Sequence, residues 1–180
     1  MIELIALLFV MTVLWGVFGF FRGLNRELIA TAGIILAMFA LFQFDSLLRN
    51  TLLGGVSTDQ VFLIQTLIFV IIVFFAYQTR TFFGRDVERA REGRNTSQNS
   101  VLGALVGALN GYLIWGTIWY FMDINEYPLS PYIIAPAPGS VSDQARNALP
   151  LVFLGGGPTG NGDLLAVLVI VMFVIVLALI

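Results

Sequence analysis

Five long apolar runs, separated by more polar connections, dominate the pattern of this 180-residue chain. A helix needs about 20 residues, and no fewer than roughly 17, to cross a hydrocarbon core of ~30 Å. The runs do not alternate as strands would, and in lipid each segment must satisfy its own backbone groups, so helices are predicted. The predicted spans cover about residues 2–21, 28–44, 61–79, 101–121 and 164–180. An alternative for the last run is a tail that lies partly in a groove of a partner protein.

The composition is that of a membrane protein, because 58% of the residues are hydrophobic and only 11% are charged. No ordinary water-soluble domain of this size has that balance. The predicted fold class is therefore an all-α integral membrane protein with about five transmembrane helices. We expect a four-helix membrane core over 1–121, a proline- and glycine-rich extracytoplasmic connection over 122–163, and a C-terminal transmembrane helix over 164–180.

Three residue types are missing, and their absence excludes much chemistry. Without Cys there are no thiolate-held clusters or disulfides, and without His the commonest ligand of haem, zinc and copper is missing. Without Lys the chain cannot form a Walker-type phosphate loop. We therefore expect no catalytic residue, no metal, no cofactor and no nucleic-acid partner. A membrane enzyme using Asp123 or Glu126 is the weakest alternative, since neither has an accompanying base, nucleophile or metal set.

The arginines predict the orientation. The first connection holds Arg22 and Arg26, and the third, over 80–100, holds five of the nine basic residues. These two connections are expected on one side of the membrane, and basic connections are typically cytoplasmic. The N-terminus is therefore expected outside and the C-terminus inside. The third helix is expected to continue one or two turns beyond its span and to stop at Gly93, and Ser100 is expected to cap the fourth helix.

A charged turn lies between the first two spans, in the stretch GFFRGLNREL over residues 19–28. Ionised side chains at the bilayer centre are costly, so this group marks the membrane surface. Glu27 suits the positive end of the second helix, and Arg22 and Arg26 can pair with it or with lipid phosphates. A structural clamp is the favoured interpretation, and a transport gate is the alternative. Anionic lipid headgroups are expected near the arginines of this side, namely Arg22, Arg26, Arg85, Arg89, Arg91 and Arg94.

Small residues line one face of the fourth span. Gly103, Gly107 and Gly111 recur every four residues, and Asn110 beside them could hydrogen bond across that face. Such a face lets another backbone approach closely. Packing inside the chain is the favoured interpretation, and a docking face for another subunit is the alternative. A looser repeat in the first span consists of Gly16, Gly19 and Gly23.

The connection over 122–163 holds all six prolines, which favour extended backbone. Its segments 132–134 and 149–154 are too apolar for a solvated linker, so we expect them on the membrane surface or against another protein. Residues 155–162, with the sequence GGGPTGNG, lack the lysine of a phosphate loop. They are expected to form a turn before Asp163, which would cap the last helix.

The stretch 19–28, followed by Ala32 and Gly33, resembles the early signature of the colicin V production protein family. Members have an Arg-Gly-x-x-Arg-Glu turn and a glycine-bearing second helix. The segment LGALVGALNG over 102–111 is similar to the family's small-residue fourth helix, although members often carry a basic residue where this chain has Asn110. The resemblance covers roughly residues 1–122. It implies a bacterial inner-membrane protein linked to peptide-toxin production or export and to envelope maintenance, without an established catalytic activity.

Two functions are expected from these observations. The favoured one is a non-catalytic accessory, scaffold or assembly subunit of a larger inner-membrane complex, energy-transducing complexes included, that binds other integral membrane subunits. The glycine faces and the apolar outer connection motivate it. The alternative is a component of a transport or export system, as the resemblance suggests. Gln65 and Asn110 are the main strongly polar side chains inside the spans, which is a thin lining for a conduction path.

Overall fold

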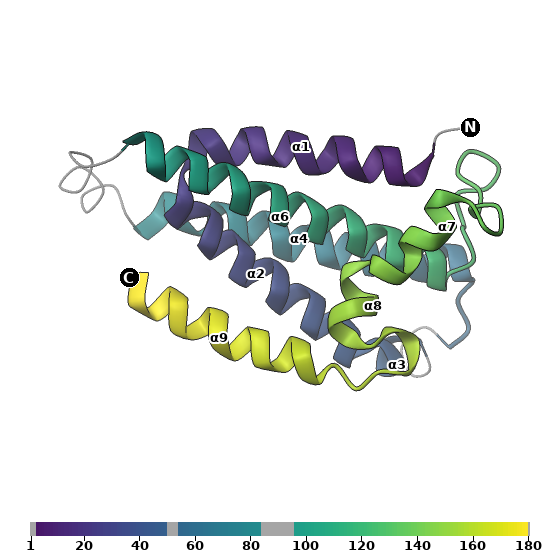
Figure 1. Cartoon of the computed structure of the whole chain (residues 1–180). Coiled ribbons are helices and arrows are strands. Elements are labelled where there is room, and N and C mark those ends of the chain that lie inside the picture. The colour runs from purple at the N-terminus through teal and green to yellow at the C-terminus, as the bar shows by residue number, and fades with distance from the viewer. Residues whose placement is uncertain (1–2, 50–53, 84–95, 180) are drawn as a thin grey trace.

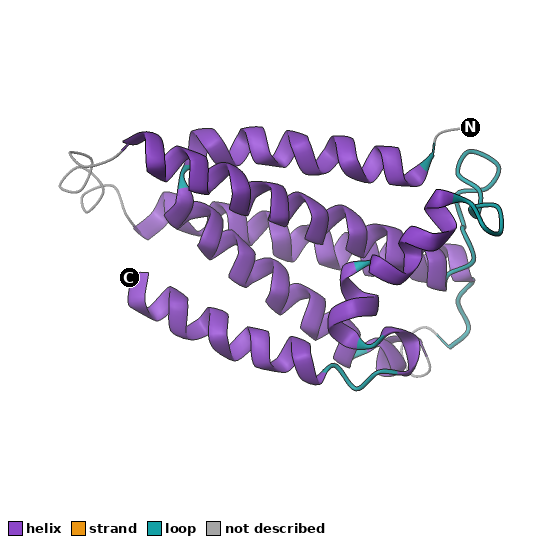
Figure 2. Cartoon of the chain, viewed as in Figure 1, coloured by secondary structure: helices purple, strands orange, loops and turns teal. Residues whose placement is uncertain are grey.

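The computed structural model describes residues 3–49, 54–83 and 96–179, and its regular elements in those ranges are all helices (Figure 2). Four helices are long and apolar enough to cross a membrane. They are α1 (Leu4–Arg22), α2 (Leu24–Gln43), α4 (Thr58–Phe83) and α6 (Thr96–Ile124). The predicted all-α membrane fold is confirmed.

Two helix starts differ from the sequence prediction. α2 begins at Leu24, several residues before the expected start near 28, because its first turn follows directly on the turn at Gly23. α6 begins at Thr96, so Ser100 lies inside the helix, and the prediction that it caps α6 is wrong. The polar side chain with a capping role here is Asn99, whose Oδ1 accepts a hydrogen bond of 3.2 Å from the backbone N–H of Leu24 in α2. The predicted stop at Gly93 lies outside the described residues.

The long helices run side by side with their connections at alternate ends (Figure 1). We call the end that carries the α1–α2 turn the turn end. The start of α6 and the C-terminal end of the chain lie there as well. The opposite end, which we call the cap end, carries the start of α1 and the short helices α3 (Asp45–Leu47), α7 (Val141–Ala145) and α8 (Pro150–Gly155). This arrangement places the first connection and the two helix ends that flank the third at the same end of the bundle, as alternate crossing requires.

α2 and α6 form the middle of the bundle. α1 packs mainly on α6, whereas α4 packs mainly on α2. The buried positions of α2 follow a spacing of three and four residues, as expected for a helix with one face in a core. Ile34 and Met38 on that face are fully buried, as is Phe69 of α4, which meets Phe121 of α6 edge to face at 5.8 Å.

The connection after α6 folds back onto the bundle, which corrects in part the expectation that 149–154 lies on the membrane surface or against another protein, although Phe153 stays exposed. Leu149 and Leu151 are buried against the chain's own helices, and α8 packs on α6. Gly116 of α6 makes room for Pro150, since a Cβ there would lie 2.5 Å from the proline Cδ. Pro150 opens α8, where its fixed φ and missing N–H suit the first helical position. The short helices η2 (Arg146–Ala148) and η3 (Gly157–Thr159) flank α8.

The last helix, α9 (Asp163–Leu179), runs beside α2 (Figure 1). Its 17 residues span about 25 Å at 1.5 Å per residue, which is shorter than a hydrocarbon core of ~30 Å. A full crossing by residues 164–180 therefore stays a prediction. Asp163 is the first residue inside the helix, and its carboxylate accepts a hydrogen bond of 2.9 Å from Asn161.

Candidate functional site

The charged turn predicted between the first two helices is a tight one, made by a single glycine. Gly23 has φ +79°, a left-handed backbone conformation that side chains with a Cβ rarely adopt. A Cβ there would also lie 2.7 Å from the Asn99 side chain of α6. The turn therefore brings Arg22, at the end of α1, within reach of the first turn of α2.

A buried carboxylate lies at the centre of the turn end. Glu27 of α2 is 1% exposed, and its Oε1 accepts a hydrogen bond of 2.9 Å from Arg22 of α1. Its Oε2 accepts from Asn110 Nδ2 of α6 at 2.8 Å and from the Tyr77 hydroxyl of α4 at 3.4 Å. One side chain thus receives hydrogen bonds from the three other long helices. Removing the charged partner of a buried carboxylate costs about 3–5 kcal/mol, and removing a neutral hydrogen-bond donor costs about 1–3 kcal/mol.

Both the nitrogen and the oxygen of the Asn110 side-chain amide have hydrogen-bond partners. Its Nδ2 also lies 3.1 Å from the Glu27 carbonyl oxygen, and its Oδ1 lies 2.7 Å from the Thr31 hydroxyl. Thr31 Oγ1 is in turn 2.8 Å from the Glu27 carbonyl. The amide is fully buried, so these partners replace the water that a polar group would otherwise need.

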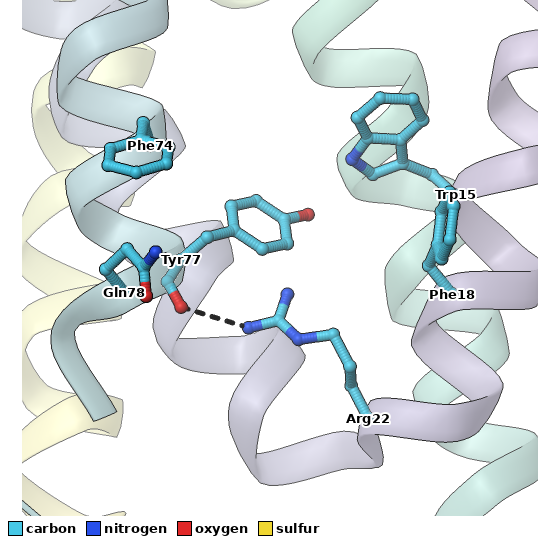
Figure 3. Close-up of a pocket in the computed structure, with 6 residues that line it drawn as sticks. All are labelled: Trp15, Phe18, Arg22, Phe74, Tyr77 and Gln78. Atoms are coloured by element: carbon cyan, nitrogen blue, oxygen red, sulfur yellow. Dashed lines mark hydrogen bonds between the residues drawn. The ribbon is translucent and has the colours of Figure 1, made fainter. Parts of the chain in front are cut away.

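Arg22 completes the group from the membrane-facing side. Its guanidinium lies 4.2 Å from the centre of the Tyr77 ring and donates to the Tyr77 carbonyl oxygen at 3.3 Å. Figure 3 shows Arg22 and Tyr77 pointing toward one another across the space between α1 and α4.

The glycines of α6 pack against α1, so the small-residue face of α6 is used for packing inside the chain. A Cβ on Gly107 would lie 2.5 Å from the Trp15 carbonyl oxygen, and one on Gly103 would lie 2.5 Å from the Gly19 carbonyl oxygen. A Cβ on Gly111 would lie 2.6 Å from Trp15 Cβ. Ordinary contacts of a Cβ are 3.4–4 Å, so the backbones approach more closely than any larger residue allows. In this structure α1 covers the face, and its use as a docking surface for another subunit stays an untested alternative.

A second polar cluster lies at the cap end and was not predicted. Arg49 donates to Asp45 at 2.9 Å and to Asn125 Oδ1 at 3.0 Å. Gln65 donates to Asp45 at 2.6 Å and accepts from Asn125 at 3.0 Å. Gln65 and Asn125 are buried. The sequence signals were a lone glutamine in an apolar run and a lone arginine in the second connection, but nothing in their spacing joined them.

A layer of apolar side chains separates the two polar clusters. It consists of Ile34, Met38, Phe69 and Phe121, all buried. One buried polar group, Thr117, lies on α6 between Asn110 and Asn125, and its hydroxyl has no hydrogen-bond partner among the described residues.

A third group of charges ties down the connection beyond α6. Arg146 pairs with Asp123 at 2.9 Å and also with Asp143. The Gly139 amide donates to Asp143 at 2.8 Å, and this hydrogen bond, followed by the Arg146 contact, lowers the pKa of Asp143. The Asp123 carboxylate in turn raises the pKa of Arg146. Burial raises the pKa of Tyr127 to about 12.

The charged turn and the glycine face both lie in the part of the chain that a known family matches. The family described as colicin V production protein matches residues 5–135, which is well over half of the chain and includes both the charged turn and the glycine face. The chain therefore belongs to the colicin V production protein family, as its signature indicated, and it is a multi-pass membrane protein. Comparison with curated proteins gave no match, and comparison with solved structures gave none.

Proposed function

We propose that this protein is a non-catalytic accessory or scaffold subunit of the bacterial inner membrane, which acts by binding other integral membrane proteins. The observation that carries the proposal is the self-contained interior. The buried polar groups described above hydrogen bond to one another, and the small-residue face is filled by α1. The interior thus serves to hold a shape, and the surface is what remains for interaction.

The cap end offers the surface best suited to a partner. Tyr132 is 93% exposed, and Val141 and Phe153 are exposed as well. These residues belong to the connection beyond α6, outside the four long helices. Apolar residues exposed beyond the membrane spans support an interaction with another protein or with the membrane surface. We infer that the partner is an integral membrane subunit that reaches this end of the bundle.

A photo-crosslinking residue at position 132 tests this proposal in native membranes. The expected result is one crosslinked partner in fixed ratio, with no such product from the same residue at Asn161, an exposed polar position of the same connection. A Tyr132→Asp variant should lose the partner while keeping its fold. Equal labelling from both positions, or no product from either, would contradict the proposal.

The orientation is part of the proposal and has its own test. The chain has no Cys, so a single introduced cysteine is its only thiol that the reagent can label. Ser97 lies at the turn end, Ala137 lies in the connection that follows α6 at the cap end, and both are exposed. An impermeant thiol reagent added outside intact spheroplasts should label Ala137→Cys and spare Ser97→Cys. The opposite pattern would reverse the orientation.

A second candidate function is a component of a transport or export system. Family membership supports it, since the family is described by colicin V production. A conduction path would require the apolar layer at Phe69 and Phe121 to open. A deletion strain should then show altered export or envelope permeability, and unaltered values for both would count against this candidate.

A further inference from the structure

A groove lies between α1 and α4 at the turn end. α1 packs mainly on α6 and α4 mainly on α2, so the space between α1 and α4 is left open. Its volume is about 360 Å³, within the range of roughly 300–1,000 Å³ that small ligands occupy. The lining residues are Trp15, Phe18, Arg22, Phe74, Tyr77 and Gln78 (Figure 3).

The polar part of the groove is the Arg22 guanidinium, which has more N–H donors than the acceptors around it use. The Arg22 guanidinium has five N–H donors, and one each goes to Glu27 and to the Tyr77 carbonyl. Among the described residues no acceptor takes the other three. Arg22 is 26% exposed while Glu27 is 1% exposed, so the positive partner of the pair is the one that faces outward.

The apolar part lies deeper in the membrane. Arg22 is the last residue of α1, and an ionised side chain at the end of an apolar helix is expected at the membrane surface. Trp15 is seven residues earlier, about 10 Å along the helix axis toward the membrane centre. Phe18 of α1 and Phe74 of α4 are exposed, one on each wall of the groove. A cation at the surface and aromatic walls below it match a molecule with an anionic head and an apolar tail.

We propose that this groove binds one anionic phospholipid, whose phosphate contacts Arg22 and whose acyl chain lies between Phe18 and Phe74. The surrounding bilayer supplies this ligand, and a phosphate pairs with a guanidinium through two parallel N–H donors. The lipid fills the gap between α1 and α4, and its phosphate accepts hydrogen bonds from the Arg22 donors that Glu27 and the Tyr77 carbonyl do not use. This site does not depend on the proposed subunit function.

The test is native mass spectrometry of the detergent-purified chain, titrated with phosphatidylglycerol or with phosphatidylcholine of the same acyl chains. The wild type should prefer phosphatidylglycerol for the first bound lipid. Arg22→Gln should reduce that preference about fivefold, as expected for one basic residue at an anionic surface. Arg49→Gln is the matched control, because Arg49 is 25% exposed and paired with a carboxylate but lies at the other end.

A second pair of variants keeps the test valid if Arg22→Gln does not fold. Phe18→Ala removes one wall of the groove, and Phe9→Ala removes an exposed phenylalanine from the same helix outside it. Phe18→Ala should weaken phosphatidylglycerol binding and Phe9→Ala should not. Glycerol phosphate, which has the anion without the chains, should not displace the lipid. Unchanged binding in Phe18→Ala, or displacement by glycerol phosphate, would overturn the proposal.

Discussion

Replacing Gly107 by valine should separate α1 from α6, because Gly107 lies where the two backbones are closest. A Cβ at this position would lie 2.5 Å from the Trp15 carbonyl oxygen, against an ordinary minimum of 3.4 Å, so one helix must move by about 0.9 Å. The nearest atoms belong to the backbone and cannot rotate away. Overpacking of this kind costs about 1–3 kcal/mol, and valine adds two methyl groups beyond the Cβ, so we expect the upper part of that range.

The assay uses a disulfide that reports the α1–α6 distance. A Cβ built on Gly16 lies 3.3 Å from Ala108 Cβ, close to the spacing of roughly 3.5–4.5 Å in disulfides. The Gly16→Cys/Ala108→Cys pair should therefore crosslink under mild oxidation. Adding Gly107→Val should lower the yield and shift the unfolding midpoint in detergent. Leu105→Phe is the control, since it adds bulk to an exposed position of α6. Full crosslinking with unchanged stability in Gly107→Val would refute the tight helix contact.

Three further predictions concern the turn end and the connection that follows α6. Asn110→Leu should reduce the free energy of unfolding by about 1–3 kcal/mol, because the buried Glu27 carboxylate loses a donor; a change under about 0.5 kcal/mol would contradict this role. Gly23→Ala should cost about 1–3 kcal/mol through its positive φ, and a stability equal to wild type would mean that the turn can relax. Asp143 has a lowered pKa in the folded chain, so its stabilising effect is present above about pH 3.9 and is lost as the pH falls through the folded value. Hydrogen exchange of the Gly139 amide, corrected for its intrinsic pH dependence, should therefore rise below about pH 4, and Asp143→Asn should abolish that rise.

The helices and the glycine contact could be predicted because each depends on a pattern within one segment. An apolar run of sufficient length predicts a span, and glycines at every fourth position predict a small-residue face. The partner of that face was harder to predict. A partner inside the chain and an intermolecular partner would have produced the same sequence pattern.

The polar clusters could be predicted only in part, because they join residues that lie far apart in the sequence. Arg22 and Glu27 are five residues apart, and their pairing was one of the two uses considered for Arg22, lipid phosphates being the other. Tyr77 and Asn110 reach Glu27 only once four helices have assembled, and no local spacing encodes that contact. The same holds for Asp45, Gln65 and Asn125 at the cap end.

The apolar stretch 149–154 was misplaced in part, at its buried residues Leu149 and Leu151, for a similar reason. The hydrophobicity of this stretch showed that another surface must cover it. It did not show whether that surface is the membrane, another protein or the chain's own helices. The space it fills is made by Gly116 of α6, more than thirty residues earlier, and that glycine has no marked sequence context. Helix ends such as Thr96 were also missed, because a polar segment outside the membrane can continue a helix without any change in hydropathy.

The most direct test of the subunit proposal is the composition of the particle that carries this chain in its native membrane. The tagged chain would be extracted in mild detergent, purified, and its co-migrating proteins identified and quantified by mass spectrometry. The proposal predicts at least one other integral membrane protein at fixed stoichiometry, lost from the Tyr132→Asp variant. A chain that purifies alone or only with copies of itself would contradict it.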